Sequence, residues 1–309
     1  MINNELDISE YRKLCVHEAS IPLFSKDWWL DAVAPNEWDA KVYKKKNGDI
    51  IGAFVYHYKI TDKGKIIDRA PISQNNGIWM NKKLFSNVYS YRKYEESIMD
   101  SIISEINEMK LISYSQQFHH SITNWLPFFW NYYQCAVRYT YIIDTSSDID
   151  TIFNGFSSNN RNCVRKAQKL VKVDDSLNAE EFYNLNKMTF ARQGLEIPYS
   201  YDLFMRVEKA CSQRDCRKIL AAYDQERNLH AAIYLVWDES SVYYLFSASD
   251  PQFRNSQANS FLIYEGIKFA KSINRSFDFE GSVIKRVEKN IRQFGGIQQP
   301  YFKIFKQFK

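Results

Sequence analysis

The order of the predicted elements constrains this chain of 309 residues more than any other feature, because the same order occurs twice. In each half, a β-hairpin is followed by a strand, a helix, a strand, a second helix and a final strand. In the first half, Asn47-Gly48 is typical of a two-residue hairpin turn, and the spacing of Ile98, Ile102 and Ile106 predicts a helix. Because each half mixes antiparallel and parallel strands, we expect an α+β fold with a mixed α/β sheet, duplicated within the chain.

The individual elements follow from apolar periodicity and turn residues. In the first half we predict helices over residues 26–33, 91–109 and 123–132, and strands over 40–45, 50–58, 65–68, 111–115 and 137–143. In the second half we predict helices over 179–194, 201–212, 260–272 and 285–294, and strands over 218–223, 229–237, 242–247, 276–280 and 301–305. The polar stretch 144–150 is the expected boundary, so the predicted domains are residues 1–148 and 149–309.

Composition narrows the class of protein. No segment approaches the ~20 consecutive apolar residues of a membrane-spanning helix. Residues 1–10 carry acidic side chains in place of the basic start of a signal peptide. The five cysteines are scattered, and their spacing does not match that of a zinc site. We therefore expect a cytoplasmic protein with reduced thiols, no membrane span and no metal.

Positive charge is concentrated in the second half. Residues 1–150 have a net charge of −2 and residues 151–309 a net charge of +7. The segment 158–172 has no acid, and Arg161, Arg165, Lys169 and Lys172 recur at helical spacing, with Lys166 beside them. This stripe is either a solvated helix surface or a seat for the phosphates of a nucleotide, coenzyme or RNA.

Two acidic residues stand out in the predicted strand 276–280. Strand alternation places Asp278 and Glu280 on one face, where a buried carboxylate is costly unless it is paired or faces a cavity. One interpretation is a general base at the end of the strand. The other is an ion pair of both acids with the basic residues nearby, which are Arg275, Lys285 and Arg286.

The turn over residues 249–259 joins a strand to a helix. A helix N-terminus has free N–H groups and binds phosphate well. Ser256 and Asn259 are also good N-cap residues, an interpretation that needs no ligand.

Three weaker candidates lie in the first half. His119 and His120 occupy the place that matches 280–281 in the second half, and a core or surface pair is the simpler interpretation. The aromatic cluster 125–133 is consistent with base stacking or with a core. Arg69, in the loop after a predicted strand, either lines an acceptor crevice or belongs to an ordinary turn.

The second half resembles the C-terminal half of FemABX-type proteins, which belong to the GNAT (GCN5-related N-acyltransferase) superfamily. The resemblance rests on YLFSAS at 244–249, RNSQAN at 254–259, FDFEGS at 277–282, RQFGG at 292–296 and PYFKI at 300–304. NRNCVRKA at 160–167 is similar to the basic segment that opens the second domain of these proteins. The resemblance implies two tandem GNAT-like domains, the fold of acyl-CoA N-acyltransferases.

The resemblance also implies transfer of an acyl or aminoacyl group to an amine. Such a reaction needs a slot for the donor's phosphates, a base for the amine and donors for an oxyanion. We expect Glu280 to be the base and Asp278 to orient it. The phosphates are assigned to Arg161, Arg165, Lys166, Arg254 and the N–H groups near Asn259. Tyr244 and Ser282 are further candidates for proton donation or oxyanion contact.

The donor stays open between acyl-CoA and aminoacyl-tRNA. CoA-dependent relatives carry Gln/Arg-x-x-Gly-x-Gly/Ala at the turn, and here Arg254 matches while Gln257 and Asn259 replace the glycines. The tRNA-dependent relatives often carry a long helical hairpin, which has no counterpart here. The expected acceptor is a small-molecule or peptidoglycan-precursor-like amine. The alternative is a non-catalytic GNAT-fold module that binds a nucleotide, an RNA or a cell-wall precursor.

Overall fold

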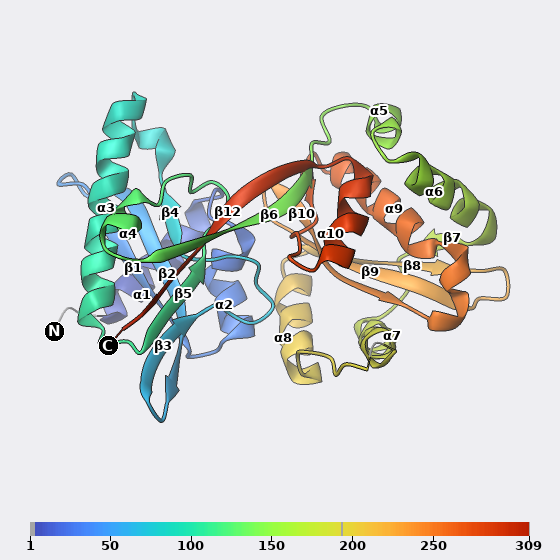
Figure 1. Cartoon of the computed structure of the whole chain (residues 1–309), viewed down its shortest axis with the longest axis horizontal. Helices are drawn as coiled ribbons and strands as arrows, with labels where there is room; N and C mark the ends of the chain where they lie inside the picture. Colours follow the sequence, from blue (N-terminus) through green and yellow to red (C-terminus); the bar gives the residue numbers. More distant parts are fainter. Residues whose placement is uncertain (1–3, 193, 309) are drawn as a thin grey trace. The chain divides into compact units, whose positions relative to one another are not determined.

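The computed structural model describes residues 4–192 and 194–308, and the chain divides into two compact units (Figure 1). The first contains residues up to 138 together with those from 300 onward, and the second contains residues 139–299. Both boundaries fall inside strands, β6 (Gln134–Ile143) and β12 (Ile297–Gln307). The units therefore differ from the predicted halves by the end of the chain and by the segment 139–148.

The first unit is a mixed sheet with helices. Its strands follow the order β1-β2-β3-β5-β12, with β4 beside β2. They are β1 (Trp38–Lys44), β2 (Ile50–Thr61), β3 (Gly64–Asp68), β4 (Ile78–Met80) and β5 (Ser113–Gln117). The helices are α1 (Asn4–His17), α2 (Asp27–Val33), α3 (Val88–Glu108) and α4 (Leu126–Trp130). The apolar face of α3 packs on this sheet, and Ile304 of β12 belongs to the same core.

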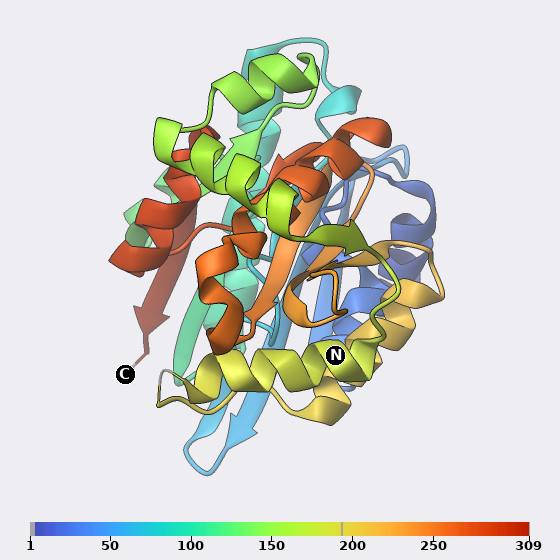
Figure 2. The same ribbon diagram turned by 90° about the vertical axis from the view of Figure 1, so that its right-hand side faces the viewer.

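The second unit has the strand order β6-β11-β10-β9-β8-β7. Its strands besides β6 are β7 (Lys172–Asp174), β8 (Arg217–Tyr223), β9 (Leu229–Trp237), β10 (Ser241–Ser249) and β11 (Ser276–Asp278). Its helices are α5 (Ile149–Asn154), α6 (Ser158–Leu170), α7 (Ala179–Ala191), α8 (Tyr201–Ser212), α9 (Ala258–Ser272) and α10 (Lys285–Ile291). Helices α6 and α9 cover one face of the sheet, and α7 and α8 cover the other (Figures 1 and 2).

The predicted mixed α/β fold is confirmed, including both hairpins, β1–β2 and β8–β9. Three details of the prediction are wrong. Lys172 lies in β7, so the basic helix ends before it. Helix α9 begins after Gln257 and has no side-chain cap, so neither Ser256 nor Asn259 is its N-cap. Strand β11 ends at Asp278, because Glu280 has a φ of +57° and cannot continue a strand.

Helices α1 and α5 and the strands β4 and β7 are absent from the prediction. Strands β4 and β7 have three residues each, too few to produce an alternating pattern. Residue 193, inside the predicted helix 179–194, lies outside the described residues.

Candidate active site in the second unit

Two neighbouring parallel strands, β10 and β11, diverge within the sheet of the second unit. Strand β10 pairs with β11 only from Ser241 to Tyr243, and β11 ends at Asp278 while β10 runs on to Ser249. One edge of the second half of β10 is therefore left without a strand partner. A cavity of about 1060 Å³ opens there, lined by residues 244–249 of β10 and by Phe279, Glu280 and Gly281.

A β-bulge lies where the strands separate. Tyr244 pairs with Leu235 of β9 and Phe246 with Tyr234, so Leu245 is the extra residue and has no register partner. Bulges redirect backbone groups and side chains and are common beside active sites. Leu245 also lines the cavity, so the bulge is part of its wall.

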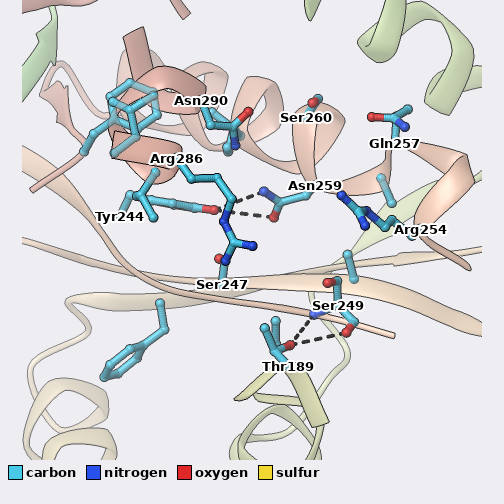
Figure 3. Close-up of a pocket in the computed structure, with 18 of the residues that line it drawn as sticks. Thr189, Tyr244, Ser247, Ser249, Arg254, Gln257, Asn259, Ser260, Arg286 and Asn290 are labelled. Carbon is cyan, nitrogen blue, oxygen red and sulfur yellow. Dashed lines mark hydrogen bonds between the residues drawn. The ribbon is translucent and has the colours of Figure 1, made fainter. Parts of the chain in front are cut away.

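Helix α7 holds the far end of the same strand edge. The amide of Asn186 donates to the carbonyl of Ser247 at 2.8 Å, and the N–H of Ser249 donates to Thr189 Oγ1 at 2.9 Å. The second contact is visible in Figure 3. These bonds satisfy backbone groups that lack a strand partner, so the edge is fixed without closing the cavity.

The turn between β10 and α9 forms a second wall. Gln257 adopts a left-handed conformation with φ of +61°, which is uncommon for a residue with a side chain. In the first turn of α9, the N–H of Ala258 lies 3.3 Å from Ser256 Oγ and that of Ser260 donates to the carbonyl of Gln257 at 3.0 Å. The helix dipole at this uncapped end favours an anion.

The cavity lining is positively charged. Among the described lining residues are four cations, Arg192, Arg254, Arg286 and Lys289, and one carboxylate, Glu280. Figure 3 shows that Arg254 and Arg286 come from opposite walls, the turn before α9 and helix α10. An excess of cations beside a helix N-terminus is suited to phosphate.

Tyr244 and Asn259 link the strand wall to the helix wall. The Tyr244 hydroxyl lies 3.3 Å from Asn259 Nδ2 and 3.4 Å from its Oδ1 (Figure 3). Burial raises the pKa of Tyr244, so its hydroxyl keeps its proton at neutral pH and can donate a hydrogen bond.

Glu280 lies in a tight corner directly after β11. Its backbone N–H donates to Asp278 Oδ1 at 2.7 Å, and the same oxygen accepts a hydrogen bond from Thr140 of β6. Gly281 follows with φ of +66°, and a Cβ on it would lie 1.9 Å from the carbonyl oxygen of Tyr139. The corner therefore needs glycine at 281 and the Asp278 carboxyl to hold Glu280 at the cavity wall.

Asp278 itself does not line the cavity. Its side chain is buried, and this burial raises its pKa to about 6, although the hydrogen bonds from Thr140 and Glu280 oppose the rise. The predicted ion pair with a basic neighbour is wrong for Asp278, because its carboxyl group accepts from a hydroxyl and a backbone N–H. The predicted shared strand face is also wrong, because only Asp278 is in the strand.

The structure brings together four of the residues chosen from the sequence: Arg254, Asn259, Tyr244 and Glu280. It places the basic residues of α6 elsewhere: Arg161 donates to the carbonyl of Asn154 at 2.9 Å, and Arg165 lies over the ring of Phe153. Neither these nor Lys166 line the cavity.

Ser282 and Arg69 are also outside the cavity lining. The hydroxyl of Ser282 accepts a hydrogen bond from the N–H of Ile284 at 3.1 Å. Arg69 is exposed and belongs to the first unit.

Sequence reasoning missed Arg192 and Lys289, and it considered Arg286 only as an ion-pair partner. The sequence signal that could have pointed to these cations is the cluster of basic residues in α10, which are Lys285, Arg286 and Lys289. Within the described ranges 4–192 and 194–308, no group of three His, Cys, Asp or Glu side chains is placed to hold a metal ion.

A cationic cavity where two parallel strands diverge is a structural feature by which a class of protein can be recognised. Comparison with known families identifies the class: residues 155–282 match the family model described as acetyltransferase (GNAT) domain. The match lies within the second unit and supports a GNAT domain there. The resemblance to FemABX-like GNAT proteins that the sequence indicates is confirmed.

Solved structures confirm the tandem GNAT fold over nearly the whole chain. FemX has a TM-score of 0.69 at 14% identity, covering 98% of this chain and 96% of that chain. The C-terminal domain of a putative lysylphosphatidylglycerol synthetase from Agrobacterium fabrum has a TM-score of 0.59 at 8% identity, with 98% and 92% covered. A tandem GNAT protein from the clavulanic acid biosynthesis pathway has a TM-score of 0.52 at 8% identity, with 99% and 96% covered.

No curated protein sequence matches this chain. None of the helices in the described part of the chain combines the length and the apolar character needed to span a bilayer.

Proposed function

We propose that the second unit transfers an acyl or aminoacyl group from a phosphate-bearing donor to an amine. The observation that carries this proposal is the cationic cavity where β10 and β11 diverge, beside the uncapped start of α9. The donor is acyl-CoA or aminoacyl-tRNA, and the acceptor is a small-molecule or peptidoglycan-precursor-like amine. FemX and the putative lysylphosphatidylglycerol synthetase share the fold, which makes an aminoacyl donor worth testing beside CoA.

The chemistry assigns a role to each wall. Arg254 and the first turn of α9 hold the donor's phosphates, by charge and by the helix dipole. The amine nitrogen attacks the acyl carbon and forms the new C–N bond, while the thioester or ester bond breaks. Glu280, directly or through a water, accepts the proton that the amine loses, and the thiolate or alkoxide leaving group takes up a proton. We assign the N–H of the bulged Leu245 and the Tyr244 hydroxyl as donors to the oxyanion.

Measurement of donor binding tests whether Arg254 holds the donor's phosphates. Acyl-CoA, charged tRNA and uncharged tRNA are compared by thermal shift, because a ligand of the folded state raises the melting temperature. Arg254→Ala is expected to weaken binding of the active donor by about 1.5–3 kcal/mol, the contribution of a charge-assisted hydrogen bond. Arg165→Ala, which removes a guanidinium outside the cavity, is the matched control and should leave binding unchanged. Equal losses in both variants would contradict the assignment of the phosphate site.

Measurement of turnover tests the role of Glu280 as the general base. Glu280→Gln keeps the shape of the side chain and removes its basicity, so kcat is expected to fall about 10²–10⁴-fold while donor binding persists. Glu265→Gln, in α9 outside the cavity lining and with Lys268 as its partner, should have normal turnover. A Glu280→Gln enzyme with normal kcat would exclude Glu280 as the base.

A second candidate, a binding module without catalysis, is favoured by one observation. Gln257 and Asn259 carry side chains at the turn where CoA-dependent relatives have glycine. Donor binding without turnover toward any amine would support this module, and turnover would exclude it.

A further inference from the structure

A second unusual surface lies in the first unit, between β5 and β6. No Lys, Arg, Asp or Glu occurs from residue 111 to residue 137, although 25% of the chain is charged. Residues 119–133 of this stretch include six Phe, Trp or Tyr residues. We call residues 119–133 the aromatic segment.

Part of the aromatic segment packs into the core, and part is exposed. Phe128 and Tyr133 are buried. The exposed side chains are Leu126 (48%), Phe129 (55%), Trp130 (55%) and Tyr132 (88%), all on or next to α4. A cluster of large exposed apolar side chains marks an interaction site more often than a solvent-facing surface.

The backbone holds one of these rings outward. Tyr132 has a φ of +63°, a left-handed conformation that is rare for a bulky side chain. The N–H of Tyr132 donates to the carbonyl of Phe129 at 3.0 Å, which fixes the turn after α4. Strained backbone of this kind is concentrated at functional sites.

Cations border the aromatic segment. Lys82 donates to the carbonyl of Ser121 and Lys306 to that of Asn131, both at 2.9 Å. A carboxylate that is bonded to the segment through Asn124, Glu95, is buried and is paired with Arg92.

We propose that the aromatic segment docks on an anionic phospholipid bilayer. Trp and Tyr prefer the membrane interface because their rings are apolar and each carries a polar group. The segment has no Lys, Arg, Asp or Glu side chain to dehydrate when α4 enters the interface. The ammonium groups of Lys82 and Lys306 then meet lipid phosphates, and the attraction of an anionic surface adds to apolar burial.

Vesicle co-sedimentation of the full chain tests this proposal. The wild type should sediment with vesicles of phosphatidylglycerol and phosphatidylcholine, and less with phosphatidylcholine alone. Phe129→Ser combined with Trp130→Ser removes two exposed rings, so the fold is retained and the partition coefficient should fall at least about tenfold. Val16→Ser with Ile60→Ser, which removes two side chains exposed to 77% and 71% elsewhere in the first unit, should bind like the wild type.

Lys82→Gln separates the electrostatic part of the interaction. It should weaken binding about fivefold on the anionic vesicles and leave binding to phosphatidylcholine unchanged. Two results would overturn the proposal. One is a wild type that binds neither vesicle, including the case where it self-associates through these rings instead. The other is a double serine variant that binds as well as the wild type.

Discussion

Gly281 decides how closely the corner after β11 approaches β6. Its φ is +66°, and a side chain would place its Cβ only 1.9 Å from the Tyr139 carbonyl oxygen, so there is no room for one. Because Glu280 precedes it, a displaced corner also moves the proposed base. The stability of the fold and the position of this carboxylate therefore depend on the same residue.

Gly281→Ala is expected to lower the free energy of unfolding and to reduce turnover together. The matched control is Gly48→Ala, at φ of +91° with no atom within 4 Å, which adds backbone strain without a steric clash. The strain alone costs about 1 kcal/mol, and we expect Gly281→Ala to cost at least about 2 kcal/mol more. Chemical denaturation measures both variants, and equal losses would show that the contact with Tyr139 is unimportant.

Asp278 gives the stability a pH dependence with a defined sign. Burial raises its pKa to about 6 in the folded state, above the ordinary value of 3.8, so the folded state binds the proton more tightly. Its contribution is most favourable below pH 4 and is lost as the pH rises through 6. The loss is about 3 kcal/mol, since one pKa unit corresponds to about 1.4 kcal/mol.

The variant Asp278→Asn is expected to remove this dependence, because the amide does not ionise. Unfolding free energies of both proteins at pH 4 and pH 7 give the test. The wild type should lose stability relative to the variant as the pH rises. An unchanged difference between the two pH values would mean that Asp278 does not titrate in this range.

The turn from β10 to α9 combines a glycine-like backbone with a glutamine side chain. At φ of +61°, Gln257 is strained, and a side chain at this position hinders the close approach of a phosphate to the backbone. This element therefore determines how close a donor can come to the start of α9.

Gln257→Gly should tighten acyl-CoA binding at least about threefold and leave stability within about 1 kcal/mol of the wild type. Lys110→Gly, at φ of +51° in the first unit, is the control for relief of the same backbone strain. Isothermal titration calorimetry measures the affinity of both variants and of the wild type for acyl-CoA. Tighter binding in both variants, or in neither, would show that the Gln257 side chain does not limit the approach of the donor.

The sequence predicts elements well where periodicity and turn residues agree. Helix α8 and strand β9 have the predicted bounds, and the turn with Arg254 and Asn259 lies at the cavity as expected. The turn at Glu280 could not be predicted in this way, because a positive φ at Glu280 does not change the alternation of polar and apolar residues in the sequence. The cations of the cavity come from the residue after α7, the turn and α10, and only the folded sheet brings these three parts of the chain together.

At the scale of the whole molecule, the end of the chain belongs to the first unit. Residues 303–307 of β12 pair with β5, and Ile304 is buried in the core of that unit. A fragment ending at the predicted boundary of 148 would lack this strand.

Ile304→Ala is expected to destabilise the first unit by about 2–5 kcal/mol through the cavity it leaves. Ile297→Ala, at an exposed position of the same strand, should change little. Hydrogen exchange followed by mass spectrometry reports each unit separately. Loss of protection confined to the second unit in Ile304→Ala would contradict the placement of this residue.

The return of β12 also determines the order in which the newly made protein can mature. Residues 139–299 leave the ribosome as one continuous stretch, whereas the first unit needs a strand that is translated after this stretch. Domains generally fold in the order in which they are synthesised, and this chain inverts that order. Until β12 has been translated, the nascent first unit exposes the edge of β5, where a chaperone or a neighbouring nascent chain can pair with it.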